Sequence, residues 1–460
     1  MSFLLILLMP GLFLVIAARH SAHAAGTSLN LIQRTGPPSS TVKVMGVDFG
    51  SSETVVLTFD GAPVGSTITS GGGFTTTFQI PWLAKAGSHT VQASGQTSKL
   101  TVTTTFTVQT SWSTFGYNIQ RMRFNPYENS VSTSNVSKLN VGWNYPTGSA
   151  INSSPAIANG NVYIGSSDKR LFDLDSKTGI VKWSMMAGDA INSSPTISNG
   201  SIYVGSNDGK LYAVDALSGK IRWTTTTKGP ILSSPIVAND LVYVGSNDSS
   251  FYALSTKNGS IKWSITTGGA ISSSPALAKG ILYIGSADGK LYALDALTGT
   301  LKWSDTIGSP LTGSPAINDG IVYIGADDHK LYALDALTGT LKWSYSTTNM
   351  IRSSPAIYDW QQLVYIASMD GKFYALNVKT GKLKWSYTTP HPLLSSPAIA
   401  YGVLYFGGND NQLYALNAAT GAKILDYNIG AGSDFTSSPA IADGVVYIGS
   451  VDAKLYAFHL

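Results

Sequence analysis

One arginine stands out from a regular series of loop residues that could recognise a ligand. A guanidinium can bond both oxygens of a carboxylate, so Arg352 suits an acidic group of a peptide or a sugar. Asp189, Lys228, His391 and Asp434 are further charged or titratable outliers in nearby loops. We take these five as candidate ligand-binding residues; ordinary variation of solvated loops is the alternative. The series is the residue before each Ser-Ser-Pro or Gly-Ser-Pro step: Asn152, Asn192, Leu232, Ser272, Thr312, Arg352, Leu394 and Thr436.

Catalytic chemistry finds little support in the residue types. The chain has no cysteine, which excludes disulfides, thiolate metal sites and Cys nucleophiles. No glutamate follows Glu128. The histidines beyond residue 24 are far apart and lack metal-ligand spacing, and no serine lies in a nucleophile-elbow pattern. We therefore expect no catalytic residue and no metal site. These histidines are His89, His329, His391 and His459.

Aspartates recur at equivalent positions and could suggest calcium. Each lies at an expected hairpin turn, where Asp commonly bonds its own backbone. We expect them to be spread around a ring, so that no two need share an ion. Turn formation is the favoured interpretation. They are Asp168, Asp208, Asp248, Asp288, Asp328, Asp370, Asp410 and Asp452.

Two markers keep one period through most of the chain. The Ser-Pro prolines are spaced by 40 residues five times and then by 42 twice, at Pro155, Pro195, Pro235, Pro275, Pro315, Pro355, Pro397 and Pro439. Tryptophan keeps the same phase, with Leu425 in the eighth place. Such a period indicates a repeat architecture. The series is Trp143, Trp183, Trp223, Trp263, Trp303, Trp343 and Trp385.

Each unit reads as four antiparallel strands. Alternating β-branched and aromatic residues predict strands, and Asp288-Gly289 is typical of a tight hairpin turn. Four strands in about 40 residues, repeated in tandem, describe the blades of a propeller. Residues 455–458 end the eighth unit without a fourth strand, and residues 139–143 supply an unpaired one. Pairing the two would close an eight-bladed β-propeller over residues 139–460.

The region before the propeller differs in its residue pattern and lacks the 40-residue repeat. Residues 1–24 predict a signal peptide, with Ala22-His23-Ala24 before the cut; an uncleaved anchor is the alternative. Residues 41–108 predict a small immunoglobulin-like β-sandwich, and residues 109–138 a connector whose aromatics could dock on the propeller. The fold class is therefore all-β. We expect a secreted or extracytoplasmic monomer, on the cell surface or in the periplasm, with no membrane span after cleavage.

The repeat resembles a known family. Residues 293–303 carry Ala-x-Asp-x-x-Thr-Gly-x-x-x-Trp, which residues 333–343 repeat in full. This spacing is similar to the tryptophan-docking motif of pyrroloquinoline-quinone-type propeller repeats. Residues 112–117, followed by Asn125-Pro126, look like the lead-in of such propellers. The resemblance implies a scaffold role for the seven tryptophans, with each ring buried against the small residues of its neighbour.

Quinoprotein dehydrogenases have such propellers, so the resemblance implies the residues that would bind their cofactor. Their quinone carries three carboxylates and is usually held with calcium by a Glu and an Asn, near a catalytic Asp and often two adjacent cysteines. Here Cys is absent, no Glu follows Glu128, and Arg352 is the only arginine expected near the central region. We therefore expect no cofactor.

Three functions remain in view. The leading hypothesis is a non-catalytic extracellular scaffold that binds a protein, peptide or glycan. The alternatives are a degenerate or unusual quinoprotein oxidoreductase, which would bind pyrroloquinoline quinone, and an envelope protein-assembly factor. The net charge of +4 is thinly spread, without a basic run, so no nucleic-acid partner is expected.

Overall fold

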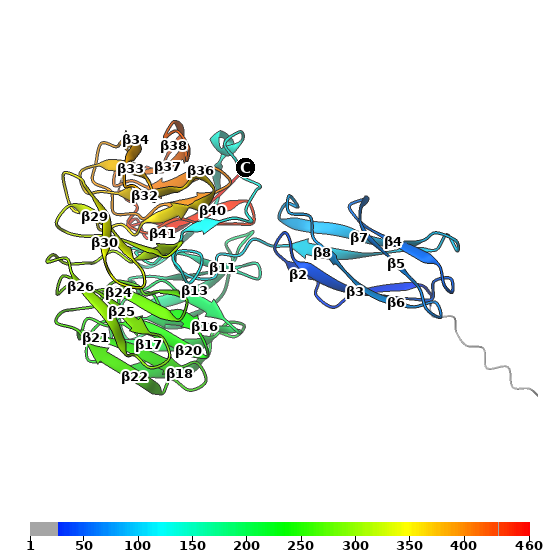
Figure 1. The fold of residues 1–460 in the computed structure, drawn as a ribbon, viewed down its shortest axis with the longest axis horizontal. Coiled ribbons are helices and arrows are strands. Elements are labelled where there is room, and N and C mark those ends of the chain that lie inside the picture. The colour runs from blue at the N-terminus through cyan, green and yellow to red at the C-terminus, as the bar shows by residue number, and fades with distance from the viewer. Residues whose placement is uncertain (1–25, 431) are drawn as a thin grey trace, which may run out of the picture. The chain divides into compact units, whose positions relative to one another are not determined.

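The structure is a computed structural model that describes residues 26–430 and 432–460, so the predicted signal peptide at 1–24 lies outside the described residues. Contacts divide the chain into two compact units, dominated by residues 41–106 and by residues 107–460. Both are built of strands (Figure 1). Within the described residues, no helix has the length and apolar character needed to cross a membrane.

Residues 28–108 form two sheets. Along β3, residues alternate between exposed and buried, as expected for strands with one face against a core. Val42, Val55 and Phe106 are fully buried. The first sheet is β1 (Ser28–Leu31), β3 (Thr41–Val47) and β6 (Phe74–Gln79), and the second, in spatial order, is β2 (Thr35–Gly36), β8 (Thr101–Val108), β7 (Gly87–Gly95), β4 (Thr54–Phe59) and β5 (Ala62–Ile68).

Residues 140–460 form eight sheets, each with four antiparallel strands. Seven consist of four strands consecutive in the chain: β11 (Ala156–Ala158), β12 (Asn161–Gly165), β13 (Arg170–Asp175), β14 (Val181–Met186); β15 (Thr196–Ser198), β16 (Ser201–Gly205), β17 (Lys210–Asp215), β18 (Ile221–Thr226); β19 (Ile236–Ala238), β20 (Leu241–Gly245), β21 (Ser250–Ser255), β22 (Ile261–Thr266); β23 (Ala276–Ala278), β24 (Ile281–Gly285), β25 (Lys290–Asp295), β26 (Leu301–Thr306); β27 (Ala316–Asn318), β28 (Ile321–Gly325), β29 (Lys330–Asp335), β30 (Leu341–Ser346); β31 (Ala356–Tyr358), β32 (Leu363–Ala367), β33 (Lys372–Asn377), β34 (Leu383–Thr388); and β35 (Ala398–Ala400), β36 (Val403–Gly407), β37 (Gln412–Asn417), β38 (Lys423–Asn428). Short 3-10 turns lie at Val136–Lys138 and Asp359–Gln361.

The eighth sheet joins the two ends of this region. Its order is β10 (Asn140–Pro146), β41 (Lys454–His459), β40 (Val445–Gly449) and β39 (Ala440–Ala442). Trp143 lies opposite Ala457 and Asn144 opposite Tyr456. An outer strand from residues 140–146 thus completes the C-terminal sheet and covers an edge that would otherwise be open to pairing with other chains.

A closed ring of hydrogen bonds links all eight sheets. The serine before each Ser-Pro proline donates its backbone N–H to the Oγ of the equivalent serine in the next sheet, at 2.9–3.1 Å. Ser438 donates to Ser154 and closes the circle over 284 residues. We call these residues the serine ring: Ser154, Ser194, Ser234, Ser274, Ser314, Ser354, Ser396 and Ser438. The many four-stranded sheets and this ring are the features of a β-propeller.

The outer-strand tryptophans contact the following sheet. Each of the seven indole N–H groups donates to a backbone carbonyl there, at 2.9–3.2 Å. The Trp303 ring packs on Gly339, where a Cβ would come within 2.7 Å of the indole and where φ is +75°, so only glycine suits this position. All seven rings are partly buried.

Replacing Trp303 by alanine should lower the free energy of unfolding by about 2–4 kcal/mol, because a half-buried ring and one hydrogen bond are lost. Chemical denaturation monitored by circular dichroism measures this. Leu301→Ala is the matched control, since Leu301 lies on the same strand and is 52% exposed; it should change stability by less than about 0.5 kcal/mol. A Trp303→Ala cost no larger than that of the control would show that the indole does not hold the sheets together.

Candidate functional site

The predicted connector contains a segment that runs around one end of the propeller. We call residues 112–125 the strap. Its backbone bonds the first strand of one sheet after another: Trp112 with Ile157, Ser113 with Ile197, Ile119 with Leu277, Gln120 with Ile317, Met122 with Ile357 and Arg123 with Ile399, at 2.7–2.9 Å. At its end, β9 (Phe124–Asn125) pairs in parallel with β35, and the Asn125 amide reaches the carbonyl of Ile441.

Two strap arginines are buried at the centre of the propeller. Arg121 is 0% and Arg123 is 1% exposed. Arg121 donates to the carbonyls of Pro275 and Ser234 at 2.9 Å and to that of Phe115, and Arg123 donates to Pro397 at 2.6 Å. Both guanidiniums lie over the Phe115 ring. The prediction that Arg352 is the only arginine near the centre is therefore wrong, because the strap has no repeat from which its path could be inferred.

Burial of these arginines is not offset by a carboxylate. Among the described residues, neither guanidinium forms an ion pair, and Nη1 of Arg123 is buried without a hydrogen-bond partner. Burial, together with the charge of Arg123, lowers the pKa of Arg121 to about 9, and burial alone does the same for Arg123. Both side chains remain cationic at neutral pH, stabilised by carbonyl dipoles and the Phe115 face.

An axial cavity of about 190 Å³ lies at the centre of the propeller, bounded by Phe115 and the serine ring. All eight residues of the loop series that opened the sequence analysis line this cavity. The repeat thus brings together residues spread over nearly 300 positions. Apart from Arg352, they are neutral: Asn152, Asn192, Leu232, Ser272, Thr312, Leu394 and Thr436.

Arg352 already has a carboxylate partner. Its Nε and Nη2 donate to the two oxygens of Asp327 at 3.1 and 3.0 Å. The hydrogen bond with Asp327 raises the pKa of Arg352. The sequence analysis missed Asp327, whose carboxylate occupies the Arg352 guanidinium donors that an anionic ligand would need.

The other four candidates do not line the axial cavity. Asp189 lies 3.6 Å from Lys169 in an exposed ion pair. Lys228 is exposed and borders a shallow hollow beside Asp208. His391 is exposed, and Asp434 is half-buried. The structure therefore does not assemble the five residues into one site.

The recurrent aspartates tie loops together. Asp288 accepts hydrogen bonds from the N–H of Lys290 at 2.9 Å, the hydroxyl of Tyr292 at 2.6 Å and the N–H of Gly268 at 2.8 Å. Burial raises the pKa of Asp288, but these hydrogen bonds outweigh it and the net shift is downward. Six of the eight carboxylates bond both their own hairpin and the adjoining loop, whereas Asp328 and Asp410 bond only their own hairpin among the described residues.

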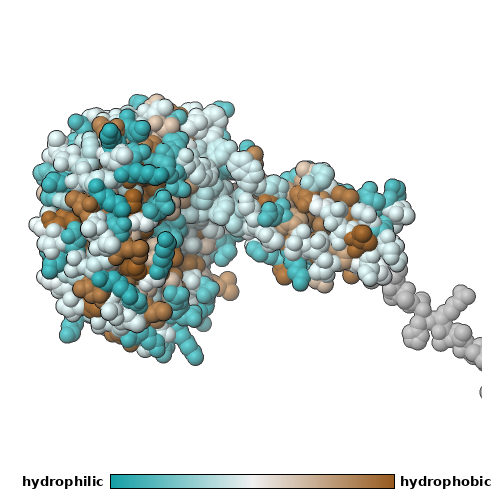
Figure 2. All heavy atoms as spheres, in the orientation of Figure 1, coloured by the Kyte–Doolittle hydropathy of each residue, from teal (hydrophilic) through white to brown (hydrophobic). Residues whose placement is uncertain are grey.

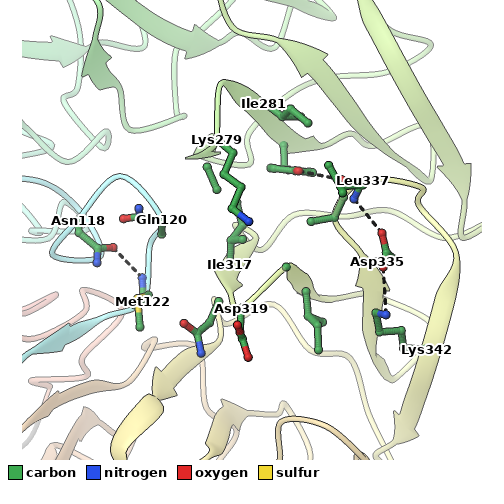
Figure 3. Close-up of a pocket in the computed structure, with 16 residues that line it drawn as sticks. Asn118, Gln120, Met122, Lys279, Ile281, Ile317, Asp319, Asp335, Leu337 and Lys342 are labelled. Carbon is green, nitrogen blue, oxygen red and sulfur yellow. Dashed lines mark hydrogen bonds and ion pairs between the residues drawn. The ribbon is translucent and has the colours of Figure 1, made fainter.

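A pocket of about 660 Å³ lies beside the strap (Figure 3). We call it the strap pocket. The strap contributes Asn118, Gln120 and Met122, and the two sheets β23–β26 and β27–β30 contribute the rest. The apolar side chains include Ile281, Ile317 and Leu337, and the charged ones are Lys279, Asp319, Asp335 and Lys342. The volume is in the range of small-ligand and peptide pockets.

The axial cavity does not fit a quinone held with calcium. Calcium takes six to eight oxygens, carboxylates among them, and no carboxylate lines this cavity. Within residues 26–430 and 432–460, no group of three His, Cys, Asp or Glu side chains could hold a metal ion. The one charged group of the wall, Arg352, is neutralised by Asp327, so a tricarboxylate would find little electrostatic support.

Fold and repeats together define an all-β protein with a propeller of quinoprotein-type repeats. The family model described as outer membrane protein assembly factor BamB matches residues 185–314 and 308–460. These matches span residues 185–460, which is 276 of 460 residues. The chain therefore belongs to this family. The β-propeller domain family of glucose/ethanol/alcohol dehydrogenases matches residues 112–194. No curated protein matches the chain.

Solved structures share the fold at low sequence identity. BamB from Moraxella catarrhalis is 21% identical with a TM-score of 0.61, over 70% of this chain and 100% of that one. Quinohemoprotein alcohol dehydrogenase from Comamonas testosteroni is 17% identical with a TM-score of 0.68, over 76% and 80%. A europium-containing methanol dehydrogenase is 15% identical with a TM-score of 0.67, over 76% and 98%. At such identities these likenesses show the fold alone.

Proposed function

We propose that this protein is a non-catalytic, extracytoplasmic scaffold that binds a protein partner through its propeller. The observation that carries the proposal is the axial cavity, whose only charged wall residue is already paired and which offers no carboxylate to a metal. Membership of a family described as an outer membrane protein assembly factor supports a protein partner rather than a glycan.

The finer architecture is part of the same proposal. The eight sheets are the blades of one closed propeller, and the seven tryptophans dock neighbouring blades. Residues 1–24 direct export, residues 41–108 form an immunoglobulin-like module that acts as a spacer or second adhesive module, and the mature chain is a monomer. The serine ring and the pairing of β10 with β41 support the closure.

The proposal is tested by quinone reconstitution beside partner capture. Purified protein incubated with pyrroloquinoline quinone and Ca²⁺ should reduce no redox dye with primary alcohols or aldose sugars. Chemical crosslinking of the tagged full chain in its native host, followed by mass spectrometry, should give one protein crosslinked to propeller lysines. Quinone-dependent turnover, or the absence of any crosslinked protein, would overturn the proposed function.

A further inference from the structure

The repeat supplies an internal reference for the strap pocket. The equivalent position two repeats earlier forms a pocket of about 370 Å³, between β15–β18 and β19–β22. There, 80 residues earlier in the chain, Ser201 takes the place of Ile281 and Lys257 that of Leu337. The fold therefore does not require an apolar residue at either position. No strap residue lines that pocket.

The strap pocket differs from this reference in three ways. Its floor is more apolar, its volume is larger, and Lys279 and Asp319 replace the neutral residues Asn199 and Asn239. Lys279 and Asp319 are the departures from the repeat, because the three earlier units have asparagine at this position: Asn159, Asn199 and Asn239. Such departures are where a binding function can be added. The combination of apolar floor and opposite charges at one opening points to a ligand with both kinds of group.

Several polar groups of the strap pocket are available to a ligand. Among the described residues, the side chains of Lys279, Asp319 and Gln120 form no hydrogen bond or ion pair, whereas Asp335 is held by Lys342 at 3.0 Å and by the N–H of Leu337 at 2.9 Å. In Figure 3 the Lys279 side chain lies between the strap residues and Leu337. Gln120 offers a donor and an acceptor, which suits the two groups of a peptide unit.

The surface near the strap pocket favours a macromolecular ligand. Leu337 is 69% exposed, and its counterpart on the preceding sheet, Leu297, is 64% exposed. Figure 2 shows hydrophobic side chains scattered among polar ones on the side of the propeller in view. A small molecule inside the pocket would leave such leucines in water, whereas a protein partner would cover them as well.

From these observations we propose that the strap pocket is the docking site for an extended segment of the partner protein. A large aliphatic or aromatic side chain of the segment enters between Ile281, Ile317 and Leu337. An acidic group next to it pairs with Lys279, and the segment's backbone bonds Gln120. This inference rests on the proposed function, because it names how the protein partner is held.

The test uses peptides as probes and the repeat as the source of variants. A phage-displayed library of random 12-residue peptides is panned against the full chain, and enriched peptides are synthesised for fluorescence anisotropy. We expect enriched sequences to share a large apolar residue close to an acidic one. The double variant Ile281→Ser, Leu337→Lys gives the strap pocket the residues of its reference and should weaken their binding tenfold or more.

Matched controls separate binding from folding. Leu217→Lys makes the same change at the equivalent turn three repeats earlier, where Leu217 is 91% exposed and lines neither pocket, and should leave peptide affinity unchanged. The double variant should keep the wild-type circular dichroism spectrum and unfolding midpoint, because the fold already accepts Ser and Lys at these positions. If the double variant does not keep the wild-type spectrum and midpoint, the single variant Lys279→Glu tests the docking site instead, because Lys279 is exposed and its replacement should not affect folding. This variant should bind basic peptides in preference to acidic ones.

The outcomes distinguish this inference from the proposed function. If no peptide is enriched, or if enriched peptides bind the double variant as tightly as the wild type, the strap pocket is not the docking site. If the crosslinked partner also remains on the double variant, the partner is held elsewhere and the proposed function stands. Quinone-dependent turnover by the wild type would instead remove the proposed function itself.

Discussion

Arg121→Ala is expected to lower the free energy of unfolding of the propeller by about 3–5 kcal/mol. The change removes a fully buried guanidinium that donates to the carbonyls of Pro275, Ser234 and Phe115. Each buried carbonyl left without a donor costs roughly 1–3 kcal/mol, and a cavity remains where the side chain was. Equilibrium denaturation in guanidinium chloride, followed by tryptophan fluorescence, measures the loss.

Two further variants identify the cause. Arg121→Lys keeps the charge but cannot reach several carbonyls at once, because an ammonium lacks the planar fork; it should be nearly as destabilising as alanine. Arg170→Ala, at a half-buried position on β13, should have little effect. If Arg121→Ala costs less than about 1 kcal/mol, the strap is a surface segment that does not fasten the sheets.

The regular part of the propeller could be predicted from the sequence because one repeat unit occurs eight times. Strand order, turns and the pairing of residues 139–143 with residues 455–458 all follow from two periodic markers. The same period placed the eight loop residues around one cavity, since equivalent positions in a ring face the same axis. The repeat period therefore predicted the position of these residues without any information on what they bind.

The strap could not be predicted in the same way. The hydrogen bonds that it makes to one sheet after another join backbone to backbone, so residues 112–125 carry no periodic side-chain pattern that reveals their path. Gln120-Arg121-Met122-Arg123 resembles an exposed polar stretch, yet both arginines are buried because they meet the carbonyls of the inner strands. The strap pocket was missed for this reason, although Lys279 and Asp319, which stand where the three earlier units have asparagine, would have indicated one of its walls.

The ion pair between Arg352 and Asp327 could have been predicted from the sequence. Both residues are departures from the repeat, and they lie 25 positions apart in neighbouring loops. The interpretation failed because Arg352 was compared only with the residues at its own repeat position. A departure in one loop must also be compared with departures in the adjoining loop, where a compensating charge can lie.

Asp173→Ala is expected to stabilise the propeller by about 4 kcal/mol at pH 8 and by little at pH 4. Asp173 is 1% exposed, and its Oδ1 has no hydrogen-bond partner among the described residues. It lies opposite Tyr163 and Trp183. The other seven units have a fully buried alanine at this position: Ala213, Ala253, Ala293, Ala333, Ala375, Ala415 and Ala457.

The pH dependence follows from the direction of the pKa shift. Burial raises the pKa of Asp173 from 3.8 to about 7, against the opposing charge of Lys182. The unfolded chain therefore releases this proton near pH 4 and the folded chain only near pH 7. Stability falls as pH rises through that window, and each unit of separation is worth about 1.4 kcal/mol. Alanine has no titratable group, so the difference in free energy of unfolding between Asp173→Ala and the wild type increases from pH 4 to pH 7 and is constant above pH 7.

Asp173→Asn separates charge from size in this experiment. The amide matches the carboxyl in volume but does not ionise, so the variant should lose the pH-dependent part of the instability and keep the cost of a buried polar group. Unfolding in urea at pH values from 4 to 8 gives the three curves. Parallel curves for wild type, Asp173→Ala and Asp173→Asn would mean that Asp173 titrates alike in the folded and unfolded chain, so that its burial carries no electrostatic cost.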